Sequence, residues 1–406
     1  QGGSRPGEGV ESPTAAFSPS AFISASVVSA HGNNHAYDYP VGPGAELFDS
    51  GRFAVSAAES AWMDPQQRLL LEKGYGALHD AGRGRASLLA RDVAVVVGVQ
   101  TGDFASIKMA VPAAELPVFA VSGSATSVAA GRLSFVLGMQ GACYNTDTAC
   151  STALVAAHAA AQMVRNVECE DALALAINLM LLPLGHVLMA AAGMTSADGR
   201  CKFLDARANG YVRSEGVGAA LFEPERATAQ EAARAAWVRG SAVRSDGKSA
   251  SLTAPNGEAQ VGLVRAAMRL GGLEAGELQA TECHGTGTAL GDPIETTALR
   301  VAVMPRGSAH TTLAGVKASA GHLELAAGLI GLMKLHCALR RVLAAPNAQL
   351  RALNPHVGGA LRGAGCGLCV QLARLAAAKA CSGGVSSFGF AGTIAHAVLR
   401  HSASAA

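Results

Sequence analysis

The sequence has few aromatic residues, few charged residues and no concentration of charge of one sign. Aromatic residues make up 4% of the 406 residues, charged residues make up 15%, and the formal net charge is +2. No sustained run of lysine and arginine is present, so the chain lacks the basic patch that nucleic acids and anionic membranes attract. We therefore expect neither nucleic acid nor a membrane surface as a partner.

The chain also lacks a secretory signal and an apolar run long enough to span a bilayer. The nearest candidate, residues 172–194, is interrupted by Asn178, Pro183 and His186, whereas a spanning helix needs about 20 apolar residues. We therefore expect no membrane span and a cytoplasmic protein. An organellar location stays open, because the sequence begins without Met and its first residues resemble the edge of a fragment. Residues 1–20 are expected to be a linker or disordered.

A disulfide framework and a metal centre are not indicated either. The nine cysteines are odd in number and scattered through the chain, which favours reduced thiols. Cys366 and Cys369 form a C-x-x-C pair, but no second pair stands at metal-ligand spacing. We predict no metal site.

The sequence does contain many hydrophobic residues, many glycines and an alternation of strand-like and helix-like segments. Half of the residues are hydrophobic and 48 are glycine, which suits a layered α/β protein with tight turns and small side chains. Buried-strand runs at 92–99, 171–181 and 216–224 alternate with helical stretches, and the second half repeats this logic. The pattern predicts a duplicated α/β architecture, with one half at residues 21–230 and the other at 231–406.

Cys150 stands where a strand-like run passes into an Ala-rich helical stretch, in "YNTDTACSTALVAAHAA". The partial positive charge of a helix N-terminus favours a thiolate and lowers the pKa of a cysteine held there. The alternative is a small buried residue that fills a strand-to-helix turn. This stretch alone leaves both interpretations open.

Two histidines occupy similar junctions. His284 lies in "ECHGTGTALGDPIE" and His322 in "GVKASAGHLELAAG", each on a glycine-containing turn beyond a predicted strand. One thiol and two imidazoles on such turns are a plausible means of bringing a nucleophile and two proton donors to one pocket. Spacing alone does not show that the three meet in space.

At these blocks the sequence resembles a known family. "DTACSTALVAAHAA", "ECHGTGTALGDPIE", "KASAGHLELAAG", "GVSSFGFAGTIAH" and "MDPQQRLLLE" resemble blocks of β-ketoacyl synthases, specifically of the ketosynthase domain of a type I (modular-type) polyketide synthase. The resemblance runs from about residue 45 to 400 in the family's order. It implies an α/β thiolase-like fold with five layers, αβαβα, built from two related halves.

The resemblance also implies a reaction. Cys150, in the N-terminal half, would take an acyl chain as a thioester from the phosphopantetheine arm of an acyl carrier protein. A malonyl-type extender on a carrier would lose CO₂, and its enolate would attack the acyl group to give a β-ketoacyl-carrier product, in polyketide or fatty acid synthesis. His284 and His322, in the C-terminal half, would stabilise the enolate, and the backbone N–H groups of Cys150 and Phe390 would form an oxyanion hole.

Further roles follow from the same resemblance. Lys317 and Glu324 match supporting charges of the site, although a solvated ion pair is the alternative. Thr286 and Thr288 match hydroxyls that contact the pantetheine arm, and the ring of Phe390 matches a gate. No cofactor is expected to bind directly. The expected partners are an acyl carrier protein with its thioesters, a second copy of the chain in a homodimer, and other synthase domains.

Other polar residues of these blocks are expected to be structural. Asp292 and Glu295 should brace the loop that carries His284 rather than act as acid and base. His158, His186 and His396 should be packing or surface residues.

The sequence departs from the family pattern at several points. The family's first core strand is not evident before residue 45, where "AFISASVVSA" is at best a remnant. Ser319 stands where the family has asparagine, and Ala391 and Ile394 replace glycine and asparagine. A methyl group at position 391 restricts a hinge that glycine leaves free.

Two alternatives to a condensing enzyme stay open at this point. One is a non-elongating acyl-transfer or docking domain that keeps the acylation of Cys150. The other is a non-decarboxylating relative with the same fold, which the two-histidine pattern disfavours because such relatives pair a histidine with a second cysteine.

Overall fold

Strands and helices alternate along the chain. The computed structural model describes residues 15–18, 47–224, 236–305, 310–376 and 380–402. Its strands are β1 (Ala15–Ser18), β2 (Val93–Gly98), β3 (Cys143–Thr146), β4 (Asp171–Asn178), β5 (Gly216–Pro224), β6 (Ala236–Ser245), β7 (Ala280–Glu282), β8 (Thr311–Ala314), β9 (Leu343–Ala344), β10 (Cys366–Leu368), β11 (Ala373–Arg374), β12 (Ala380–Phe388) and β13 (Thr393–Ser402). Its α-helices are α1 (Ala57–Ala61), α2 (Pro65–Asp80), α3 (Arg85–Leu88), α4 (Asp103–Met109), α5 (Thr126–Leu137), α6 (Thr152–Arg165), α7 (Leu184–Ala191), α9 (Gly257–Leu270), α10 (Gly291–Val303), α11 (Lys317–Ala320), α12 (Ala327–Arg341) and α13 (Pro355–Ala360).

The sheet topology shows the predicted duplication. Eleven of the described strands form one sheet in the order β10-β8-β7-β12-β13-β6-β1-β5-β4-β2-β3. In the first half β3, β2 and β4 are parallel, while β5 runs antiparallel to β4 and β1 antiparallel to β5. The same order and directions recur in β8, β7, β12, β13 and β6. Two related halves are therefore confirmed.

The two halves meet at β1, which pairs antiparallel with β5 on one side and β6 on the other. This corrects the expectation that residues 1–20 are a linker, because residues 15–18 of that segment complete the sheet. The four residues AAFS are too few to give an apolar pattern that predicts a strand. The segment is a strand because it pairs with a neighbouring strand on each side. The rest of that segment, the stretch 21–30 and the expected boundary near residue 230 lie outside the described residues.

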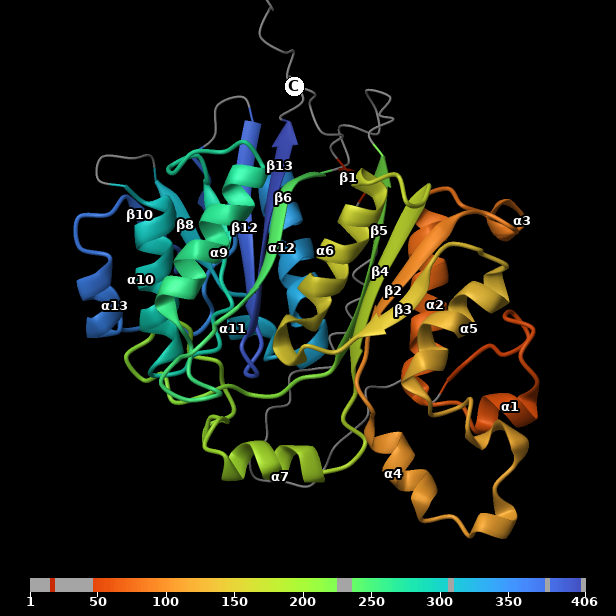
Figure 1. The fold of residues 1–406 in the computed structure, drawn as a ribbon. Coiled ribbons are helices and arrows are strands. Elements are labelled where there is room, and N and C mark those ends of the chain that lie inside the picture. The colour runs from red at the N-terminus through yellow and green to blue at the C-terminus, as the bar shows by residue number, and fades with distance from the viewer. Residues whose placement is uncertain (1–14, 19–46, 225–235, 306–309, 377–379, 403–406) are drawn as a thin grey trace, which may run out of the picture.

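Helices cover both halves in the predicted five layers (Figure 1). Helices α2 and α5 pack on the outer face of the first half, against β2, β4 and β5, and α9 packs on the outer face of the second half, against β6 and β13, with α10 beside it. Helices α6 and α12 lie between the halves: α6 contacts β4 and β2 as well as β6 and β13, and α12 contacts β12, β7 and β5. The order of the layers is helix, strands of the first half, central helices, strands of the second half, helix.

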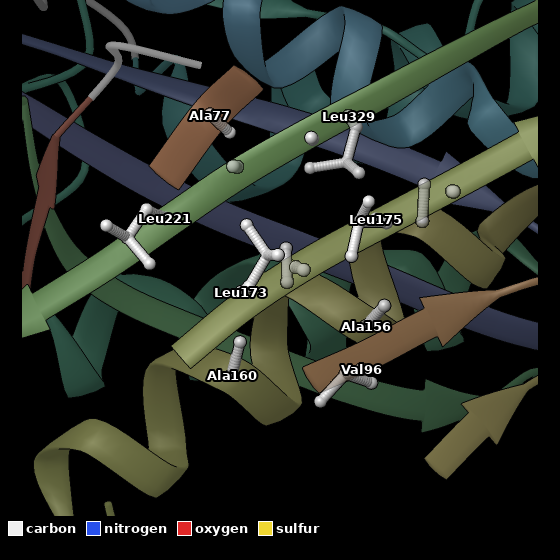
Figure 2. Close-up of a cluster of buried hydrophobic side chains, with 14 of the residues drawn as sticks. Ala77, Val96, Ala156, Ala160, Leu173, Leu175, Leu221 and Leu329 are labelled. Atoms are coloured by element: carbon white, nitrogen blue, oxygen red, sulfur yellow. The ribbon is translucent and has the colours of Figure 1, made fainter. Parts of the chain in front are cut away.

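The central layer is built from small residues. The buried face of α6 consists largely of alanines (Ala153, Ala156, Ala157, Ala160 and Ala161). Figure 2 shows Ala156 and Ala160 of this face beside Val96 of β2 and the leucines of β4. Small side chains let the central helices approach the strands and each other closely, which accounts for the abundance of alanine and glycine and the scarcity of aromatics.

This layering brings equivalent junctions of the two halves together. Cys150 lies in the 3₁₀ turn η3 (Ala149–Ser151), between β3 and α6, and His322 lies just before the 3₁₀ turn η4 (Glu324–Ala326), between β8 and α12. The two 3₁₀ turns contact each other. The repeat therefore places the thiol and one imidazole at neighbouring N-terminal ends of the central helices.

Within the described ranges, no helix combines the length and the apolar character that crossing a membrane would require.

The closest approach of the central helices predicts a sensitive position. A Cβ atom added at Gly328 of α12 would lie 2.8 Å from the backbone nitrogen of Leu154 of α6. We expect Gly328→Ala to lower the free energy of unfolding by about 1–3 kcal/mol, because the helices must separate to admit the methyl group. Urea denaturation followed by circular dichroism measures this change. Gly359→Ala in α13, where an added Cβ meets nothing within 4 Å, is the matched control, and equal losses in both variants would contradict the interpretation.

Candidate active site

The turn that carries Cys150 is held in a fixed conformation. Ala149 has a left-handed backbone with φ of 54°, and its N–H donates to Asp147 Oδ1 at 3.0 Å. The Thr148 N–H donates to Thr152 Oγ1 at 2.8 Å. The carbonyl of Cys150 accepts from Ser387 Oγ of β12 at 2.7 Å, so the nucleophile's turn is tied to the second half of the fold.

The loop after β7 is braced by two buried carboxylates from α10. Glu295 accepts from the N–H groups of His284 at 2.7 Å and Gly285 at 2.9 Å. Asp292 accepts from the N–H groups of Gly287 at 3.1 Å and Leu204 at 2.9 Å. Burial raises the pKa of both carboxyls to about 7. Their predicted role as braces of the loop is confirmed by these bonds.

His322 is fixed by backbone hydrogen bonds from a neighbouring extended segment. Its N–H donates to the carbonyl of Val212 at 2.7 Å, and its carbonyl accepts from the N–H of Ser214 at 2.9 Å. The Tyr211 ring and the imidazole pack edge to face, with ring centroids 4.9 Å apart. The imidazole therefore has little freedom to reorient.

The two imidazoles share one tautomer. His284 Nδ1 accepts from the N–H of Phe388 at 3.2 Å, and His322 Nδ1 accepts from the N–H of Glu324 at 3.2 Å. Burial, the Lys317 ammonium and the neighbouring histidine hold the pKa of His284 well below its usual range. Burial, with Lys317 and Arg213, does the same for the pKa of His322. Since a neutral imidazole that accepts at Nδ1 carries its proton on Nε2, both rings present Nε2–H donors.

These donors and the thiol share one cavity. The ring centroids of His284 and His322 lie 5.6 Å apart, and both line a cavity of about 330 Å³ together with Cys150. The cavity also includes three more of the predicted residues, Thr286, Thr288 and Phe390. His322 Nε2 is buried and has no hydrogen-bond partner among the described residues, so its proton is available to a bound group.

The remaining two predicted residues lie behind the cavity wall and not in solvent. Lys317 is 3% exposed and donates from Nζ to the carbonyl of His284. Glu324 is 8% exposed and receives a bidentate ion pair from Arg213, with Nε to Oε1 at 2.5 Å and an amino group to Oε2 at 2.9 Å. The two charges are buried and each has its own partner, so the alternative of a solvated Lys317–Glu324 pair is wrong.

The thiol of Cys150 is less acidic than its position at a helix N-terminus predicts. Burial raises its pKa to about 12, and the nearby carboxylate of Glu324 adds to the effect. Lys317 and the backbone N–H groups of Phe390 and Cys150 act in the opposite direction without overcoming it. The expectation of a lowered pKa is thus wrong, because desolvation of the thiolate outweighs the helix end.

Two backbone groups act on the thiol in the direction opposite to burial. The N–H groups of Phe390 and Cys150 lower the pKa of the Cys150 thiol, but by less than burial raises it. The Phe390 loop is close-packed, since a Cβ atom at Gly389 would lie 2.3 Å from the carbonyl oxygen of Thr148. The Phe390 ring itself is 45% exposed.

The departures from the family pattern fit this structure without strain. Ala391 and Ser319 are exposed and Ile394 is buried in the core of the second half. The left-handed conformation in the Phe390 loop falls on Gly392, with φ of 90°, and not on Ala391. The methyl group at position 391 therefore occupies an ordinary backbone conformation.

Family models decide the assignment. The model described as "Beta-ketoacyl synthase, N-terminal domain" matches residues 14–227, and the model described as "Beta-ketoacyl synthase, C-terminal domain" matches residues 235–351. The chain belongs to the β-ketoacyl synthase family. The family expected from the sequence blocks is thereby confirmed.

Individual relatives agree with the family. The chain is 39% identical over 359 residues to a phenolphthiocerol/phthiocerol polyketide synthase from Mycobacterium tuberculosis, a match that covers 87% of this chain and 16% of the relative. It is 40% identical over 377 residues to the polyketide synthase ThaG of Burkholderia thailandensis, covering 88% of this chain and 7% of the relative. The chain therefore spans only a small part of the length of these relatives.

A solved structure supports the fold. The ketosynthase from module 6 of the bacillaene synthase of Bacillus subtilis 168 superposes with a TM-score of 0.79 at 31% sequence identity, over 88% of this chain and 63% of that chain. The thiolase-like fold class is confirmed.

His158, His186 and His396 do not line the cavity, in agreement with their predicted place as packing or surface residues. His158 Nδ1 lies 2.8 Å from Ser241 Oγ, and His396 Nδ1 lies 2.9 Å from Ser386 Oγ. His186 is partly exposed on α7.

Sequence reasoning missed residues that position the site. Arg213 neutralises the buried Glu324, Tyr211 packs on His322, and Phe388 supplies the N–H that sets the tautomer of His284. Arg213 and Tyr211 stand in "ANGYVRSEG", where a tyrosine and an arginine between two glycines were the available signal. The N–H of Phe388 has no signal in sequence, because any residue type other than proline supplies it.

The raised thiol pKa predicts a pH profile for alkylation of Cys150. Iodoacetamide reacts with the thiolate, so the rate should rise about tenfold per pH unit between about pH 7 and pH 10 without a plateau. The rate is measured from intact-protein mass against time, with Cys150→Ser to subtract the other cysteines. A plateau near neutral pH would show that the thiol is acidic and contradict the assignment.

The buried ion pair predicts a non-additive double mutant. Arg213→Met leaves the Glu324 carboxylate buried without a counter-charge and should cost about 3–5 kcal/mol of stability. Adding Glu324→Gln removes the charge and should recover much of that loss, as measured by urea denaturation in a double-mutant cycle. Additive losses would mean that the two side chains act independently.

Proposed function

We propose that this chain catalyses the decarboxylative Claisen condensation of an acyl group carried on Cys150 with a malonyl-type extender on an acyl carrier protein, giving a β-ketoacyl-carrier product in polyketide or fatty acid synthesis. One observation supports this most strongly: the thiol of Cys150 and two neutral imidazoles with Nε2–H donors line one cavity.

The first step of the proposal is acylation. Sγ of Cys150 attacks the carbonyl carbon of the incoming thioester, the carrier's thiol leaves with the proton that Cys150 loses, and the acyl group stays on Sγ. The tetrahedral oxyanion is held by the N–H groups of Cys150 and Phe390, the two backbone groups that lower the pKa of the thiol. Because the resting thiol is weakly acidic, proton transfer accompanies the attack.

The second step is decarboxylation and bond formation. The extender's carboxylate leaves as CO₂, and its bonding electrons form an enolate whose thioester oxygen accepts from the Nε2–H groups of His284 and His322. The enolate carbon attacks the acyl carbonyl, the carbon–sulfur bond to Cys150 breaks, and the departing thiolate takes up one proton from water to restore the thiol. Neutral donors suit this step, because their protons stabilise the charge without quenching the carbanion.

Other residues support these steps in the proposal. Lys317 holds the carbonyl of His284, and Glu324 supplies the N–H that orients His322. Thr286 and Thr288, whose Oγ1 atoms lie 3.5 Å apart at the cavity wall, contact the pantetheine arm of the carrier. The half-exposed ring of Phe390 acts as the gate through which the second substrate reaches the cavity.

The setting of the reaction is part of the proposal. Strand β3 is an edge of the sheet that the described strands form, with Cys143 and Tyr144 exposed on it and Phe135 of the adjacent α5 86% exposed. An unpaired, partly apolar edge suits a homodimer.

Other synthase domains are proposed partners because the matched relatives are far longer than this chain. All nine cysteines are free, which suits a cytoplasmic location, and we retain 21–230 and 231–406 as the two halves.

Substitutions separate the proposed roles. Cys150→Ala should abolish acyl transfer and leave malonyl decarboxylation measurable, whereas His322→Ala should lower decarboxylation by about 10²- to 10³-fold, the usual effect of losing one such donor. Intact-protein mass after mixing with acyl-carrier thioesters reports acylation, and ¹⁴CO₂ release from labelled malonyl-carrier reports decarboxylation. Stable acylation without CO₂ release in the wild type would indicate a non-elongating domain, and equal residual condensation in both variants would contradict the roles.

A further inference from the structure

Two buried polar side chains that the proposed reaction does not use face the cavity. Asp246, just beyond β6, is 8% exposed, and Gln260, in the first turns of α9, is 1% exposed. Both line the cavity that contains Cys150. Asp246 Oδ1 and Gln260 Oε1 are buried and have no hydrogen-bond partner in the part of the chain that the structure describes. A buried acceptor without a donor costs free energy, so a retained pair of them requires an explanation.

The backbone around these two side chains is well fixed. The Asp246 N–H donates to the carbonyl of Gly392 at 2.8 Å, and the Asp246 carbonyl accepts from Asn256 Nδ2 at 2.7 Å. Asn256 in turn caps α9, accepting from the N–H groups of Glu258 and Ala259, and its carbonyl accepts from the N–H of Gln260 at 3.1 Å. The two free acceptors therefore do not result from a loosely placed loop.

Asp246 and Gln260 lie on the side of the cavity that carries the two threonines. Helix α9 packs on β6 and on α10, and α10 follows the loop that carries Thr286 and Thr288. Asp246, Gln260 and the two threonines thus belong to the same side of the cavity. Cys150 and His322 lie on the turns before α6 and α12, between the two halves, and His284 precedes Thr286 on the same loop.

A secondary amide in a buried site needs a donor for its carbonyl and an acceptor for its N–H. The threonine hydroxyls supply donors on this side of the cavity, and Asp246 and Gln260 supply free acceptors. We propose that Asp246 and Gln260 bind the amide N–H groups of a pantetheine-type arm, completing a subsite whose other half is the Thr286 and Thr288 pair. This inference rests on the proposed acylation of Cys150 by arm-bound thioesters.

The experiment compares two acyl donors in each of three proteins. S-hexanoyl pantetheine carries two amides, and S-ethyl thiohexanoate carries none while delivering the same acyl group. The rate of Cys150 acylation is followed by intact-protein mass for the wild type, Gln260→Met and Asp246→Ala. Each substitution should lower kcat/KM for the pantetheine thioester by about tenfold and leave the rate with S-ethyl thiohexanoate unchanged within about twofold.

S-ethyl thiohexanoate keeps the test informative if a variant is less stable. Its reaction shows that the protein is folded and that the Cys150 thiol reacts, without any contribution from the arm. Equal loss with both donors, or no loss with either, would overturn the subsite. A third donor, S-(3-hydroxyhexanoyl) pantetheine, tests whether the two acceptors bind a hydroxyl group of the acyl chain instead. If the substitutions lower kcat/KM for this donor and not for S-hexanoyl pantetheine, the acceptors bind the acyl chain and the inference fails. Absence of acylation in the wild type with every donor would instead overturn the proposed function.

Discussion

The close contact of the two central helices is the constraint on which the site depends. Helices α6 and α12 meet where Gly328 faces the backbone of Leu154, with no room for a side chain. Each helix follows the third strand of its half in the repeated topology, so bringing the helices together brings together the turns at their N-terminal ends. The thiol of Cys150 and the imidazole of His322 are neighbours because the fold is duplicated, and not because either segment specifies the other.

Burial then determines the chemistry of the groups so placed. It holds the pKa of both histidines well below the usual range, and it raises the pKa of the Cys150 thiol to about 12. The reacting groups are therefore neutral in the absence of substrate. The charges that are retained lie one layer further out, where Glu324 is paired with Arg213 and Lys317 with the carbonyl of His284. This arrangement directs donors at a developing negative charge without placing a permanent charge on the reacting groups themselves.

Much of this could be predicted from the sequence, for identifiable reasons. Strands such as β2 and β4 are continuous apolar runs, and Cys150, His284 and His322 stand in blocks with glycine turns at fixed offsets. Other features depend on contacts between distant segments and leave no local pattern. The tautomer of His284 depends on a backbone N–H more than one hundred positions away, at Phe388. The acidity of Cys150 was predicted with the wrong sign, because a helix end is visible in the sequence and the depth of burial is not.

Strand β1 has a consequence for how the chain reaches this state. Ala15 pairs with Pro224 and with Val238. The strand that joins the two halves is therefore synthesised before both of its partner strands, which follow more than two hundred residues later in the chain. Closing a loop of that length is entropically slow. During synthesis the segment has neither neighbour for most of the time that the first half is being made. Joining the two halves at β1 is thus a late event in assembly, and the cavity between the halves is completed only after the ribosome has produced both.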